Sequence, residues 1–274
     1  MRILLLIALC VSCASPEGQV DYDVPVEKIA ALKERLPHLK RYKRRTKELI
    51  YIAVRENGNA DEATLKLIKE TLIKFDPEYL VVEYPVQDPR LFDQELSQCE
   101  QNLGCSPSAY SCHTGKPAGI LCKSAEPFAT EMFKRARKAK LTAEQILFFS
   151  VYRELVEKEK DKPKPLEHLE KIIEEQKNLL GTSIRFDNEE FYRIYKDNMG
   201  EKVIRLNPAF LMPKAEGHYI QKIAKIMDDL HENSILEKIE KGQLDHERVM
   251  VVYGETHYRK HRDQLEEFFA SHFP

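Results

Sequence analysis

The sequence has no excess of positive or negative charge and, beyond its first dozen residues, no long apolar run. Each absence excludes a class of protein. Its 274 residues include 43 Lys and Arg against 45 Asp and Glu, a net charge of −2, so bulk positive charge does not drive binding to nucleic acid. Beyond the first dozen residues, no run approaches the roughly 18 apolar residues that span a bilayer. The ten Gly and 14 Pro follow no period and no repeat is visible, which excludes collagen-like and repeat folds. The hydrophobic residues, 42% of the chain, are enough for a core.

The first 14 residues are typical of a secretion signal. Arg2 precedes a short apolar run over residues 3–11, and small residues follow. Cleavage before Cys13 would leave a lipidated cysteine, as in bacterial lipoproteins, whereas cleavage after Ala14 would release a soluble protein; a buried N-terminal strand or helix is a third alternative. We therefore expect an exported protein. It is either a lipoprotein of the cell envelope, which meets the membrane only through a lipid anchor on Cys13, or a soluble periplasmic or secreted protein.

Apart from Cys10 and Cys13, cysteine is absent from all but one short region. Four cysteines lie within 24 positions, at Cys99, Cys105, Cys112 and Cys122. An even number in an exported protein predicts two disulfides, with three possible pairings that the spacing does not distinguish. A zinc cluster that includes His113 and free thiols are the alternatives, but gaps of five, six and nine residues do not match the close pairs of zinc ribbons.

Hydrophobic patterning predicts an α/β (α+β) fold with a mixed sheet. Short apolar runs at 49–54, 79–82 and 249–253 are typical of strands covered on both faces. Between the first two runs, helical spacing predicts a helix that Asn59 and Glu62 cap, which gives a βαβ start with a parallel pair. Because the first and last strands are expected to share one sheet, we predict a single domain over residues 15–274.

The remaining segments predict a cysteine-bearing insertion at about 88–125, a helical middle and a final strand–loop–helix. Thr142 and Gln145 form a capping box at the start of the middle. Apolar spacing over 26–39 predicts one more helix, followed by a basic run over 40–47 that is more typical of a solvated face than of a contact with lipid or nucleic acid. The other helices are expected near 142–156, 165–181, from 187, at 219–230 and at 258–272.

Polar residues follow all three predicted strands, where binding sites form in open α/β sheets. Glu83 ends an apolar strand, and a carboxylate there is unfavourable unless it is solvated, paired or bound to a metal. His257 is suited to bind a metal or act as a general base, with Glu255 beside it, and His261 lies on the packed side of the helix that follows. A turn glycine followed by an exposed histidine is the alternative. The residues at the three strand exits, where each predicted strand ends, are Arg55, Glu56 and Asn57, then Glu83, then Gly254, Glu255 and His257.

Two of these exits resemble motifs of the TraB/GumN/Tiki superfamily, whose wider relatives include haem-binding ChaN-like lipoproteins and erythromycin-esterase-like enzymes. The segment DPEYLVVE, residues 76–83, resembles the strand that ends in glutamate, and VMVVYGETH, residues 249–257, resembles the strand that leads into Gly-x-x-His. The resemblance covers roughly residues 48–85 and 215–272. At the first Gly-x-x-His element, however, Val54 and Asn57 stand where the family has Gly and His.

The resemblance implies metal-dependent hydrolysis of a peptide or ester bond in an exported substrate. His257 and Glu83 would hold a divalent ion such as Zn, Mn or Co, and Asn57, a poor ligand for such ions, replaces a histidine. His261, His218 or Glu255 would compensate. Glu255 or Glu56 would accept the proton of the attacking water, with Gly254, Tyr258, Arg55 and His218 near the ligand. The alternative is an inactive relative that binds haem through Tyr258 or His257, or binds another small molecule or a partner.

Overall fold

The computed structural model describes residues 37–55, 61–84, 89–100, 104–159, 166–200 and 203–273. The chain divides into two compact units: a sheet unit, Met1–Glu126 with Ser234–Pro274, and a helical unit, Pro127–Asn233. Helix α9, Tyr219–Asp245, is continuous across the division. The predicted signal and Cys13 lie outside the described residues, and within those ranges no helix is long and apolar enough to cross a membrane.

Five strands of the sheet unit form one mixed sheet in the order β1-β2-β5-β3-β4. Their bounds are β1 His38–Arg44, β2 Lys47–Val54, β3 Tyr79–Val82, β4 Leu121–Ser124 and β5 Arg248–Gly254. β1 is antiparallel to β2, and the other pairs are parallel. The mixed sheet and its three predicted strands, β2, β3 and β5, are confirmed. The expected pairing of the βαβ unit is wrong, because β5 lies between β2 and β3.

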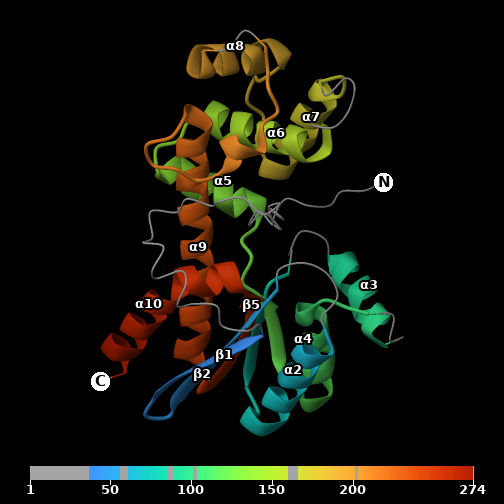
Figure 1. Ribbon diagram of the computed structural model, residues 1–274, viewed down its shortest axis with the longest axis vertical. Coiled ribbons are helices and arrows are strands. Elements are labelled where there is room, and N and C mark those ends of the chain that lie inside the picture. Colours follow the sequence, from blue (N-terminus) through green and yellow to red (C-terminus); the bar gives the residue numbers. More distant parts are fainter. Residues whose placement is uncertain are drawn as a thin grey trace. The chain divides into compact units, whose positions relative to one another are not determined.

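Alternate side chains of the sheet pack against helices on opposite faces. Leu49, Tyr51 and Val251 face one core with the C-terminal part of α9 and with α10, Glu255–His272. The neighbouring positions, such as Ile50 and Met250, face a second core with α2, Glu62–Phe75, and α4, Pro107–Gly115. Figure 1 shows these helices on the two sides of the sheet. The sheet unit is therefore a three-layer α/β/α arrangement whose parallel strands end at one common edge.

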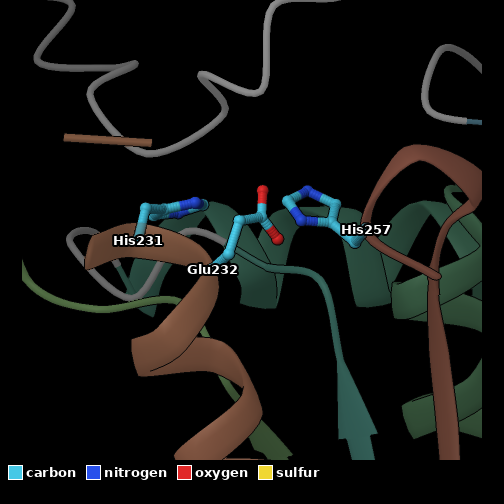
Figure 2. Close-up of side chains that lie close together, drawn as sticks. All are labelled: His231, Glu232 and His257. Atoms are coloured by element: carbon cyan, nitrogen blue, oxygen red, sulfur yellow. The ribbon is translucent and has the colours of Figure 1, made fainter. Parts of the chain in front are cut away.

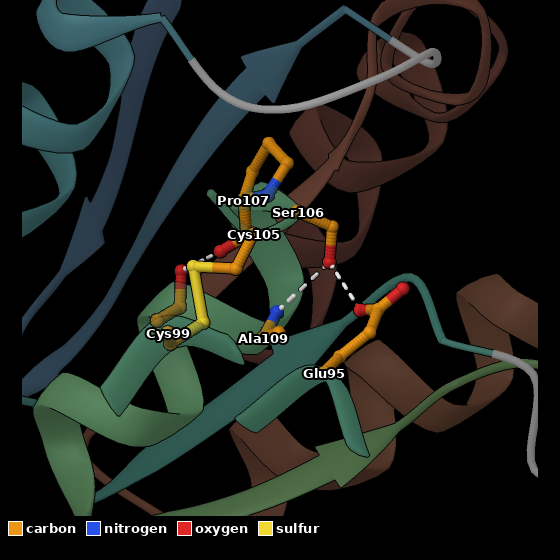
Figure 3. The surroundings of a disulfide bond; sticks show 7 residues. Glu95, Cys99, Cys105, Ser106, Pro107 and Ala109 are labelled. Carbon is orange, nitrogen blue, oxygen red and sulfur yellow. Dashed lines mark hydrogen bonds between the residues drawn. A yellow bond between two sulfur atoms is a disulfide. The ribbon is translucent and has the colours of Figure 1, made fainter. Parts of the chain in front are cut away.

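The cysteine region supplies parts of this sheet unit. Cys99, near the end of α3, Pro89–Glu100, is bonded to Cys105, and Cys112 of α4 is bonded to Cys122 of β4. Next to the first disulfide, Ser106 caps α4: its hydroxyl accepts from the Ala109 N–H at 3.2 Å and donates to Glu95 at 2.8 Å (Figure 3). The two predicted disulfides are confirmed, with neighbours paired, and they fit an oxidising compartment.

The helical unit has an apolar core of its own, rich in aromatic side chains. Phe148, Tyr152 and Phe191 are buried at its centre. The predicted capping box is confirmed, since Thr142 and Gln145 each bond the other's backbone N–H, at 2.7 and 3.1 Å. The elements are α5 Ala129–Lys138, α6 Ala143–Glu159, α7 Leu169–Leu180, α8 Asn188–Met199, the 3-10 turn η2 Pro208–Leu211 and the beginning of α9.

The structure corrects three local expectations. Residues 38–39 belong to β1 and not to the end of a helix, and much of the basic run forms this edge strand, in which Tyr42 is buried while Arg41 and Lys43 pair with Glu48 of β2. Such charges discourage a second chain from pairing with the edge. Helix α2 is capped by Asp61, whose carboxylate accepts from the Thr64 N–H at 2.7 Å. Helix α10 begins at residue 255, earlier than predicted.

Candidate metal centre

Two histidines and one glutamate converge where α9 approaches the β5–α10 junction. His231, Glu232 and His257 each offer one ligand atom, and these atoms all lie within 4.8 Å of one another. Figure 2 shows the Glu232 carboxylate between the two imidazole rings. Glu232 and His257 are buried and His231 is half-buried. Imidazole and carboxylate groups at this separation form a donor set that could hold a divalent metal ion.

The local fold of α9 explains why a carboxylate is buried there. Glu232 shares one helical stripe with Ile235, Leu236 and Ile239, at spacings of three, four and seven residues. Those three side chains pack into the core between the sheet and α10. The boundary of the sheet unit falls just after Asn233. His231 and Glu232 thus lie at the end of the helical unit, directly before the α9 segment that packs in the sheet unit.

The third ligand follows the central strand of the sheet. β5 ends at Gly254, α10 starts at once, and His257 is the third residue of that helix. The His257 side chain has no exposed surface, and its ring meets the Tyr253 ring edge to face at 5.1 Å. With no loop between strand and helix, His257 is held at the start of α10 with its side chain turned inward.

Glu83 links the end of β3 to this junction. Its Oε2 accepts a hydrogen bond from the Gly254 N–H at 2.7 Å, and its Oε1 lies 3.9 Å from the His257 Nε2. The carboxylate also sits at the start of α10, where the helix dipole favours negative charge. The 3.9 Å separation is an ion-pair distance and is longer than a hydrogen bond. Glu83 is therefore a carboxylate neighbour of His257, beside the three-residue cluster.

The buried carboxylate of Glu126 contacts Tyr253. The Tyr253 hydroxyl donates to Glu126 Oε1 at 2.6 Å, and both side chains are buried. Burial raises the pKa of Tyr253 well above its usual range, and the nearby carboxylates of Glu126 and Glu83 raise it further. The hydroxyl consequently keeps its proton at physiological pH and acts as the donor of this bond.

Other predicted site residues lie on α10 but face different neighbours. His261 is buried with its ring centroid 6.0 Å from that of His257, one turn further along the helix, and is not part of the described three-residue cluster. Tyr258 is also buried, with the rings of Tyr51 at 5.0 Å and His38 at 5.5 Å. Glu255 is half-buried, and its Oε1 pairs with Arg259 Nε at 3.1 Å.

The remaining candidates are spread more widely. Arg55 is exposed at the end of β2. His218 is exposed and belongs to the helical unit, 13 positions before His231 and about 20 Å away along the helical path. Glu56 and Asn57 lie outside the described residues. Of the predicted site, the structure thus brings together His257, Glu83 and the backbone of Gly254.

The two ligands on α9 were not among the predicted site residues. The sequence does carry one signal for them, because Glu232 interrupts an otherwise apolar stripe and is preceded directly by a histidine. Glu126 has no comparable signal, since β4, which leads to it, is short and half exposed and was not predicted.

No family model matches the chain, and neither the curated proteins nor the solved structures gave a significant match. The superfamily resemblance of the two strand exits therefore stays a prediction, and the site is interpreted from its own residues.

Proposed function

We propose that this protein is a metal-dependent hydrolase that cleaves a peptide or ester bond in an exported substrate. The observation that carries the proposal is the convergence of His231, Glu232 and His257 within 4.8 Å. The resemblance to TraB/GumN/Tiki proteins, export, and a lipid anchor at Cys13 belong to the same proposal.

The donor set fits a zinc-type ion. Two imidazoles and one carboxylate suit Zn, Mn or Co, and three protein ligands are typical of catalytic sites, where a further position is left for water or substrate. Structural zinc sites, in contrast, are closed by four protein ligands. An ion bound there would lower the pKa of a water molecule and polarise an acyl carbonyl.

The residues around the cluster have separate roles in this proposal. Glu83 orients the imidazole of His257 while its other oxygen is held by the Gly254 N–H. Glu255 stands two residues before His257 in the first turn of α10, and acceptance of a proton from water is the role that we propose for it. Glu255 also pairs with Arg259, one turn later on the same helix.

Haem binding is less well supported than hydrolysis. An axial ligand must present its side chain to an open pocket that accepts a large flat ring. Tyr258 is instead packed against two aromatic rings, and His257 is fully buried within the metal cluster. These packing contacts favour a small ion over a porphyrin.

The proposal is tested by the metal content of the full chain. After exposure to Zn, Mn or Co salts and dialysis, we expect a single ion per chain, measured by elemental analysis. His257→Ala and Glu232→Gln should lose the ion while retaining the circular dichroism of the wild type. A matched control is His246→Ala, since His246 is a histidine of the same unit that stacks on Tyr79 at 4.7 Å.

Each outcome is decisive. Loss of the ion in both site variants and not in the control would justify peptidase and esterase assays on the loaded protein. A folded wild-type chain that binds none of these ions would overturn the proposed function.

A further inference from the structure

Glu126 occupies a position that touches both elements on which the cluster is built. It follows β4 by two residues and is only 3% exposed. The two residues that follow β4 are bonded to the sheet. The Ala125 N–H donates to the Val82 carbonyl at 3.3 Å, and the Glu126 N–H donates to Ser124 Oγ at 3.1 Å. Glu126 is therefore anchored at the edge where the parallel strands end.

The side chain of Glu126 reaches β5. Its Oε1 accepts the 2.6 Å hydrogen bond from Tyr253, and the ring of Tyr253 lies edge to face against His257 at 5.1 Å. A bond between a carboxylate and a hydroxyl is shorter and stronger than one between neutral groups. It thereby fixes the aromatic ring against which the His257 imidazole rests.

The backbone of Glu126 reaches α9. Its carbonyl accepts a hydrogen bond from Lys238 Nζ at 3.0 Å. Lys238 lies six residues after Glu232 on the same helix, a distance of about 9 Å along the axis. One residue thus bonds the helix that carries His231 and Glu232 and the strand that leads into His257.

We propose that Glu126, acting through Tyr253 and Lys238, is a positioning residue that holds α9 and the β5–α10 junction at the separation the metal ligands require. The inference rests on the proposed metal site and adds residues that supply no ligand atom to it. Groups that orient metal ligands from outside the coordination sphere change metal affinity by roughly 10- to 100-fold.

The test measures zinc affinity and the cobalt(II) absorption spectrum of the full chain. Tyr253→Phe removes the hydroxyl and keeps the ring, and Lys238→Met removes the ammonium and keeps the aliphatic chain. We expect each to weaken zinc binding by about 10-fold and to change the visible cobalt bands, which report ligand geometry. Glu126→Gln retains an oxygen that can accept from Tyr253, so it should rescue most of the affinity that Glu126→Ala loses.

The matched control is Tyr152→Phe. The Tyr152 hydroxyl is also held by a 2.7 Å hydrogen bond, to the Arg205 carbonyl of the helical unit. Tyr152→Phe should lower the free energy of unfolding about as much as Tyr253→Phe does, with no change in zinc affinity or in the cobalt spectrum. Unchanged affinity and spectrum in folded Tyr253→Phe and Lys238→Met, or equal weakening in the control, would overturn the inference and leave the metal site standing. A wild-type chain without zinc binding would overturn both.

Discussion

Both units of the protein bury carboxylates, but they pair them differently. In the helical unit, the buried Glu154 pairs with Lys158, one turn later on the same helix. In the sheet unit, the buried Glu126, two residues after β4, bonds Tyr253 of β5, and the half-buried Glu83, directly after β3, bonds Gly254 and faces His257. The first pairing is local, whereas the second joins segments that lie far apart in the sequence.

The difference indicates what each buried charge does. A pair one turn apart on a helix supports that helix and depends little on the rest of the fold. Carboxylates that bond several elements fix the tertiary geometry among those elements, which is what a metal or catalytic site requires. We therefore assign the carboxylates of Glu126 and Glu83 to the geometry of the candidate site, and that of Glu154 to the stability of its own helix.

The largest predicted effect separates the two units. Phe148→Ala removes a fully buried ring from the helical core, where it contacts Tyr152, Phe191 and Tyr219. We expect a loss of about 3–5 kcal/mol in the free energy of unfolding, measured by denaturant titration. Zinc affinity should change little, because the rings that Phe148 contacts are not those of His231 or His257; a large loss of affinity would contradict this separation of stability from metal binding.

Removing a disulfide should destabilise the sheet unit by a smaller amount. Cys112 and Cys122 are ten positions apart and join α4 to β4. A loop of this length predicts a loss of about 2–3 kcal/mol in the double variant Cys112→Ser/Cys122→Ser. The corresponding variant at Cys99 and Cys105, six positions apart, should lose less. Denaturant titration of the two variants compares them, and the reverse order would show that loop length is not the deciding quantity.

Much of the fold could be predicted because its central strands are continuous apolar runs. β2, β3 and β5 are buried on both faces, so their sequences carry a strong signal. The two edge strands, β1 and β4, are half exposed and mix charged with apolar residues, and they were missed. Strand order could not be predicted either, because the position of β5 between β2 and β3 depends on contacts between residues distant in the sequence.

The site was predictable only in part for a similar reason. His257 and Glu83 follow recognisable strands, so their meeting at one sheet edge could be expected. His231 and Glu232 reach the same place because a long helix passes over the sheet, and helical periodicity alone does not show what its stripe packs against. Glu126 depends on a strand without a clear sequence signal.

The comparison of local with long-range carboxylate pairing can be tested directly by one substitution in each unit. Glu83→Gln keeps an oxygen for the Gly254 N–H but removes the charge that faces His257. We expect zinc affinity to fall by about 10-fold, the lower end of the range for groups that orient metal ligands. Glu154→Gln is the matched control, with zinc affinity unchanged. Equal effects of the two variants in a zinc titration would remove the distinction drawn between the units.

The smallest predicted effect is local to the helical unit. Thr142 Oγ1 accepts from the Gln145 N–H at 3.1 Å at the start of α6. Because Ala cannot cap the first turn, Thr142→Ala should lower the free energy of unfolding by about 1 kcal/mol. Thr142→Ser keeps the hydroxyl and should lose much less. Denaturant titration gives the stability, and zinc affinity should be unaffected in both variants. If Thr142→Ala weakened zinc binding, a purely local stability contact would be coupled to the metal centre, and the separation of local stability contacts from metal binding would fail.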